Sequence, residues 1–62
     1  MNDIEKRFLE RTSAELKLAL DEVRFWDDLV ARGKVSREHA AGYARAANGI
    51  IKTKRFILSF YD

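Results

Sequence analysis

The 62-residue chain contains no cysteine and only one histidine. A disulfide framework is therefore excluded, and a structural zinc site, which needs four cysteine or histidine ligands, is implausible. Long hydrophobic runs are also missing, because no stretch approaches the roughly 20 apolar residues that cross a bilayer. Asp3, Glu5 and Glu10 make the start of the chain unlike a signal peptide. These absences predict a cytoplasmic protein with no membrane partner, no metal and no cofactor.

The length allows one domain, spanning residues 1–62. A lone pair of helices of this size buries too little of its chain to be comfortably stable. Small domains compensate with disulfides, metals or oligomerisation, and only oligomerisation is open to this chain. With 47% hydrophobic and 35% charged residues, the composition is that of a folded chain.

Proline is absent and glycine occurs three times, so little interrupts regular structure. Apolar residues recur at spacings of three and four, which predicts a first helix over about 3–32 and a second over about 37–60. Asn2 or Asp3 can cap the first helix, and Gly33 just beyond Arg32 predicts its end. Ser36 is a suitable cap for the second helix. The turn at about 33–36 is short enough to make the pair an antiparallel helical hairpin.

An antiparallel hairpin with this turn has a predictable register, in which facing residue numbers add up to roughly 69. Bulky Trp26 then meets Tyr43 and the small residues Ala40, Ala44 and Ala47. Small Ala19 meets Ile50, so that large and small side chains alternate across the contact. Lys54 falls within the apolar stripe of the second helix. We expect its stem to cover apolar surface while its ammonium group reaches Glu15 or solvent.

Both helices carry more apolar surface than one hairpin can bury. On the first helix, a second apolar stripe with Leu18, Phe25 and Leu29 is predicted roughly opposite the main one. On the second helix, a similar stripe contains Gly42, Ala46, Gly49, Phe56 and Phe60. These eight residues are the predicted interface for self-association or a partner protein. Two-fold dimers are the commonest oligomers, so we expect a homodimeric four-helix bundle.

Charge is distributed unevenly along the chain, although its net value is only +2. Residues 1–32 have six basic and eight acidic side chains, whereas residues 33–62 have six basic and two acidic ones. Arg45, Lys52 and Arg55 share a broad face of the second helix, and Arg37 extends it toward the turn. Such a face can follow phosphates in nucleic acid, or it can simply keep the helix soluble.

No arrangement of residues indicates catalysis or a small-molecule substrate. His39 has no nucleophile or orienting group in a recognisable motif, and we expect it to pack near Trp26. The leading hypothesis is therefore a non-enzymatic regulatory or inhibitory protein that binds another protein through its apolar faces. The alternative is a dimeric regulator that binds RNA or DNA through the basic face. In length and hairpin fold, the chain resembles small dimeric regulators carried by plasmids and phages, some of which bind RNA.

Overall fold

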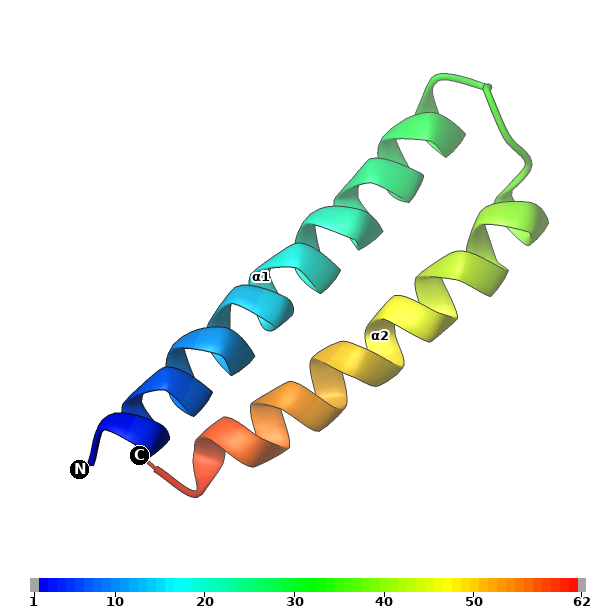
Figure 1. The fold of residues 1–62 in the computed structure, drawn as a ribbon. Coiled ribbons are helices and arrows are strands. Elements are labelled where there is room, and N and C mark those ends of the chain that lie inside the picture. The colour runs from blue at the N-terminus through cyan, green and yellow to red at the C-terminus, as the bar shows by residue number, and fades with distance from the viewer. Residues whose placement is uncertain (1, 62) are drawn as a thin grey trace.

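The computed structural model describes residues 2–61. Two helices, α1 (Asp3–Ala31) and α2 (Arg37–Ser59), run antiparallel, with the turn at one end and both outer helix ends at the other (Figure 1). The predicted helical hairpin is confirmed, and each helix ends one residue before the position expected from the sequence. Within the described residues, neither helix combines the length and apolarity that crossing a membrane requires.

Local hydrogen bonds explain where the helices begin and end. The Asn2 side-chain oxygen accepts a hydrogen bond from the Glu5 backbone N–H at 2.8 Å, and the Asn2 amide donates one to the Glu5 carboxylate at 3.1 Å. Ser36 Oγ accepts one from the His39 N–H at 3.1 Å, as an N-cap does. Gly33 has a φ of 72°, a left-handed conformation that favours glycine and ends α1.

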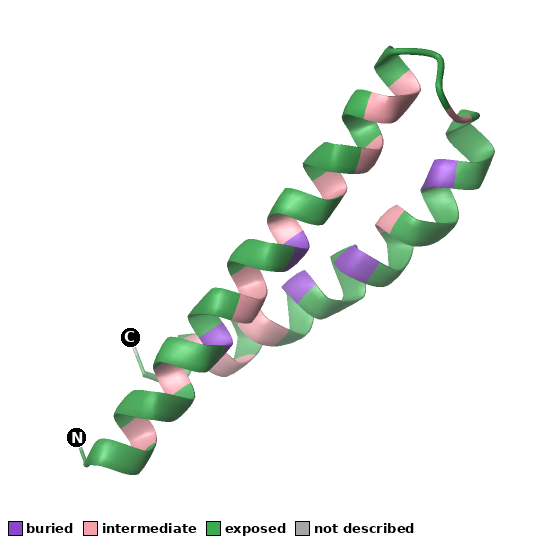
Figure 2. Ribbon diagram, turned by 45° about the horizontal axis from the view of Figure 1, so that its top comes forward, coloured by how far each residue is buried: buried purple, intermediate pink, exposed green. Residues whose placement is uncertain are grey.

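The interior of the hairpin is built mainly from small side chains. The buried residues lie on the facing sides of the two helices (Figure 2), and they are Thr12, Ala19, Ala40, Ala47 and Ile51. Alanine lets two helices approach closely, but it removes little apolar area from water. Apart from Ile51, the larger apolar side chains of residues 2–61 remain partly or largely exposed.

An aromatic cluster beside the turn shows how the helices face each other. The rings of Trp26 and Tyr43 stack with centroids 4.4 Å apart and planes 6° from parallel. Their residue numbers add up to 69, as the predicted register requires. Ile50 departs from the prediction, because it is 45% exposed and does not belong to the buried core. Its neighbour Ile51 takes the central position, and consecutive helical side chains point about 100° apart.

Candidate interaction surfaces

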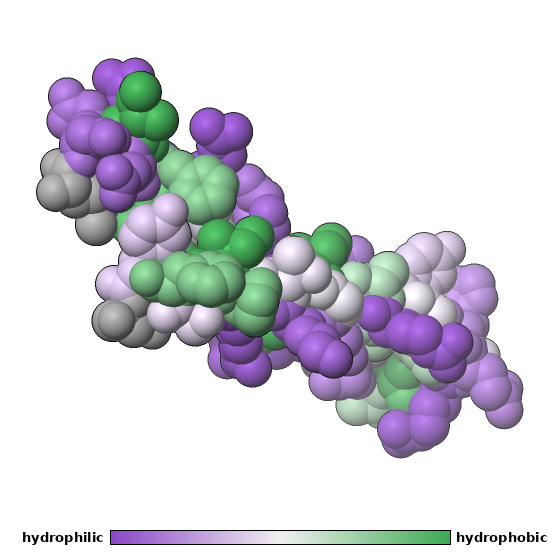
Figure 3. Space-filling view, turned by 90° about the horizontal axis from the view of Figure 1, so that it is seen from below, coloured by the Kyte–Doolittle hydropathy of each residue, from purple (hydrophilic) through white to green (hydrophobic). Residues whose placement is uncertain are grey.

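The hairpin exposes more surface than a compact protein of its mass. Its accessible surface is 5076 Å², whereas a folded monomer of 7.2 kDa has about 4,100 Å². The excess of about 950 Å² is close to the roughly 800 Å² that each partner contributes to a standard protein interface. Figure 3 shows one face, on which hydrophobic residues gather mainly in the half that carries the outer helix ends. The large apolar side chains left exposed are Ile4, Phe8, Leu18, Phe25, Tyr43, Ile50, Phe56, Phe60 and Tyr61.

The predicted stripe of α1 borders the core. Leu18 is 69% exposed and Phe25 is 55% exposed, while Leu29 is half-buried. The Phe25 ring contacts Trp26 edge-on, with centroids 5.5 Å apart and planes at 77°. Leu29 is half-buried and Phe25 touches Trp26, which belongs to the cluster between the helices, so this stripe lies nearer to the core than the expected position roughly opposite it. The stripe instead flanks the helix–helix contact along one side of the hairpin, which we call the lateral face.

Two residues of α2 that the sequence assigned to the core also belong to the lateral face. Tyr43 and Ile50 are each nearly half exposed, and Tyr43 stacks on the same Trp26 that Phe25 touches. The sequence shows that Tyr43 and Ile50 are seven residues apart and so share one side of α2. It does not show how far this side is turned away from the centre of the helix–helix contact.

The second predicted stripe runs along the exposed side of α2. Gly42, Ala46 and Gly49 are exposed there, and a Cβ atom added to either glycine would meet nothing within 4 Å. Contacts within one chain therefore do not require glycine at these positions. Phe56 and Phe60 are 64% and 69% exposed, and their rings meet edge-to-face with centroids 4.9 Å apart. The structure thus joins the two phenylalanines into one aromatic pair at the end of the stripe.

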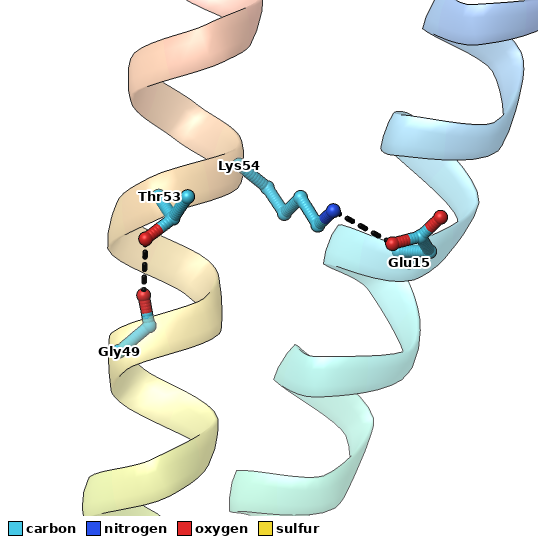
Figure 4. A network of polar contacts seen from close by, with 4 residues as sticks. All are labelled: Glu15, Gly49, Thr53 and Lys54. Atoms are coloured by element: carbon cyan, nitrogen blue, oxygen red, sulfur yellow. Dashed lines mark hydrogen bonds and ion pairs between the residues drawn. The ribbon is translucent and has the colours of Figure 1, made fainter.

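One ion pair connects the two helices. Lys54 extends from α2, and its Nζ lies 2.7 Å from Oε2 of Glu15 on α1 (Figure 4), which confirms the expectation for Lys54. The hydrogen bond from Lys54 lowers the pKa of Glu15, and the charges of Lys54 and Arg11 lower it further, while partial desolvation acts in the opposite direction. The residue numbers of this pair also add up to 69, so the register holds along the hairpin.

The four basic residues predicted to contact nucleic acid are all exposed on α2. Within residues 2–61 the ion pairs join Glu15 to Lys54 and Asp28 to Arg32, so Arg37, Arg45, Lys52 and Arg55 form none. Viewed down the axis of α2, these four side chains point in directions within about a quarter turn of one another, so they share one side of the helix. Two of the four, Lys52 and Arg55, meet Phe56 in a shallow hollow that is also lined by Thr53 and Ser59.

The only histidine is part of the aromatic cluster. Its ring centroid lies 6.4 Å from that of Trp26 and 5.4 Å from that of Tyr43, both at steep interplanar angles. His39 therefore packs near Trp26 as the sequence predicts. Among the described residues, no group of three or more acidic or histidine side chains is positioned to hold a metal ion.

Comparison with known proteins assigns the chain to no family. No protein-family model matches it, and neither a curated protein nor a solved structure shows significant similarity. Function must therefore be argued from the surfaces of the hairpin.

Proposed function

We propose that this chain is a small non-enzymatic regulatory or inhibitory protein that binds another protein through apolar and aromatic helix faces. In this proposal it works as a homodimeric four-helix bundle. The observation that carries the proposal is the ring of Phe56, which is 64% exposed, packs edge-to-face on Phe60 and has no core role. Exposed aromatic anchors of this kind are enriched at the centres of protein interfaces.

The proposal divides the surplus surface between two occupants. The lateral face, with Leu18, Phe25 and Ile50, is assigned to the second copy of the chain. The outer side of α2, with Phe56 as its anchor, is assigned to the other protein. Lys52 and Arg55 border Phe56 in the same hollow and would give specificity for a partner with acidic groups around an apolar pocket.

The test compares Phe56→Ser with the matched variant Ala41→Ser, which changes another exposed residue of α2. Proteins retained by the tagged wild type are identified, and the affinity of each purified candidate is then measured by calorimetry. We expect Phe56→Ser to weaken binding at least tenfold, as loss of an interface anchor does, and Ala41→Ser to leave it unchanged. A retained protein that binds both variants as tightly as the wild type would contradict the proposed surface.

Nucleic-acid binding is the second candidate. It is favoured by Arg37, Arg45, Lys52 and Arg55, which form no ion pair within residues 2–61, and by the position of Lys52 and Arg55 beside the exposed ring of Phe56. Fluorescence anisotropy with short duplex RNA and duplex DNA would detect it. A nucleic-acid binder should lose affinity steeply with added salt, and it should lose most of it in the triple variant Arg45→Glu, Lys52→Glu, Arg55→Glu. The control reverses three exposed cations of α1, in Lys6→Glu, Lys17→Glu, Arg24→Glu. Equal loss in both triple variants would indicate a non-specific charge effect.

A further inference from the structure

A regular row of side chains runs along the lateral face of α1 for its whole length. Successive members are alternately four and three residues apart, as in a heptad seam between two helices. All members of the row are at least partly exposed. The row consists of Ile4, Phe8, Arg11, Glu15, Leu18, Glu22, Phe25 and Leu29. We call this row the α1 seam.

The α1 seam complements itself when its direction is reversed. A two-fold axis midway between residues 16 and 17 makes the following pairs with a second copy: Ile4–Leu29, Phe8–Phe25, Arg11–Glu22 and Glu15–Leu18. The apolar residues at the two ends of the row pair with one another, and Arg11 pairs with the oppositely charged Glu22. The carboxylate of Glu15 already has its cation in Lys54, at 2.7 Å.

A second row, the α2 seam, has the same property. Its unburied residues are Tyr43, Ala46, Ile50, Thr53, Ile57 and Phe60, and none of them is charged. A two-fold axis midway between residues 51 and 52 makes the pairs Tyr43–Phe60, Ala46–Ile57 and Ile50–Thr53. In the last two pairs a smaller side chain, alanine or threonine, faces an isoleucine. The Thr53 hydroxyl donates to the Gly49 carbonyl at 3.0 Å, so its polar group is satisfied and its methyl group can pack (Figure 4).

The two seams lie on the same side of the hairpin. Phe25 of the α1 seam touches Trp26, and Trp26 stacks on Tyr43 of the α2 seam. Near the middle of the α1 seam, Glu15 binds Lys54 beside the α2 seam. One flat partner surface can therefore cover both rows together.

The two seams also place the axis at the same height. In the register shown by the two interhelical pairs, the midpoint of the α1 seam is level with a point between residues 52 and 53. The midpoint of the α2 seam is one residue away, a difference of about 1.5 Å along the helix. We infer that two hairpins pair face to face about this axis, with α1 on α1, α2 on α2 and the two turns at opposite ends. This inference rests on the dimer proposed above and specifies its orientation and register.

The charges disfavour the opposite orientation, in which both turns lie at the same end and α1 packs on α2 of the second copy. At the levels given by the hairpin register, Arg11 would then face Ile57 and Glu22 would face Ala46. Both charges would be pressed against the uncharged α2 seam without an ionic partner, which is unfavourable. The antiparallel arrangement gives each of them a partner.

Charge exchange tests the pairing directly. Arg11 and Glu22 are eleven residues apart on one helix, about 16 Å, so they cannot pair within a chain. Arg11→Glu and Glu22→Arg should each raise the dimer dissociation constant, by roughly ten- to thirtyfold, because each creates two like-charge contacts per dimer. The double variant Arg11→Glu, Glu22→Arg should return it to near the wild-type value. The control exchange Lys17→Glu, Asp21→Arg alters exposed charges outside the seam and should have little effect.

A distance measurement tests the orientation independently. The chain has no cysteine, so a spin label attached through Lys34→Cys marks the turn alone. In the inferred dimer the two labels are about 50 Å apart, whereas turns at the same end would bring them within about 20 Å. Far-UV circular dichroism of every variant verifies that the hairpin remains helical.

Sedimentation equilibrium separates the two levels of the proposal. A well-folded monomer at micromolar concentration would overturn both the dimer and this inference. A dimer whose affinity is not restored by the double exchange, or whose turn labels are close, would overturn the orientation and leave the dimer standing. Restored affinity together with distant labels is the expected result.

Discussion

Replacing the two helical glycines of α2 should stabilise the chain. A Cβ atom at Gly42 or Gly49 would meet nothing within 4 Å, so Gly42→Ala and Gly49→Ala introduce no clash. Alanine in a helix interior is more favourable than glycine by about 0.5–1 kcal/mol, because glycine loses more backbone freedom on folding. The double variant should therefore raise the free energy of unfolding by about 1–2 kcal/mol per chain, which corresponds to roughly 5–15 °C in melting temperature for a domain of this size.

The assay is urea and thermal unfolding followed by far-UV circular dichroism, at one fixed chain concentration. Gly33→Ala is the control with the opposite sign. Gly33 has a φ of 72°, and a side chain in that conformation costs about 1–2 kcal/mol. If Gly42→Ala and Gly49→Ala lowered stability or weakened self-association, the reasoning would be refuted. The glycines would then be in close contact with a second chain, which the inferred dimer does not require.

Three further predictions concern contacts within the hairpin. Tyr43→Ala removes the ring stacked on Trp26 and should lower the free energy of unfolding by about 1–3 kcal/mol. The near-UV circular dichroism signal of tryptophan should also be lost. An unchanged spectrum would mean that the stack does not form in solution. Ser36→Ala removes the cap of α2 and should cost about 1 kcal/mol in denaturant titration, whereas Ser36→Asn should restore most of it. Lys54→Met should raise the pKa of Glu15 toward its ordinary value of 4.5 in a carboxylate NMR titration. Because the folded-state pKa of Glu15 is lowered, the pair stabilises the protein above that ordinary value, and this stabilisation disappears as pH falls through the folded-state pKa. The stability difference between wild type and Lys54→Met should accordingly narrow in acid, and a difference independent of pH would contradict the ion pair.

The helices and their register could be predicted from the sequence because local chemistry determines them. Gly33 and Ser36 mark helix ends through conformations and hydrogen bonds that involve only neighbouring residues. The short turn then determines the register, which places Trp26 on Tyr43 and Lys54 on Glu15. Each of these contacts follows from spacing along the chain.

The position of the exposed stripes could not be predicted as well. Assigning a residue to a stripe depends on where the centre of the helix–helix contact falls, and an error of one residue turns a side chain by about 100°. Ile50 was placed in the core for this reason, and Phe25 was placed opposite it. The candidate interface residues and the basic residues stay predictions, since their roles depend on molecules outside a single chain.

The aromatic cluster beside the turn has a consequence for how the chain folds. The turn separates Trp26 on α1 from His39 and Tyr43 on α2 by a short stretch of chain. We expect their contacts to form early, because closing a short loop has a small entropic cost. We therefore expect the hairpin to form from the turn toward its outer end, with Phe56 and Phe60 ordered last. A molecule that binds the end of the hairpin farthest from the turn would thus slow unfolding and leave the folding rate almost unchanged. Tryptophan fluorescence, which reports on the first contacts, would record the folding rate without interference from that binding.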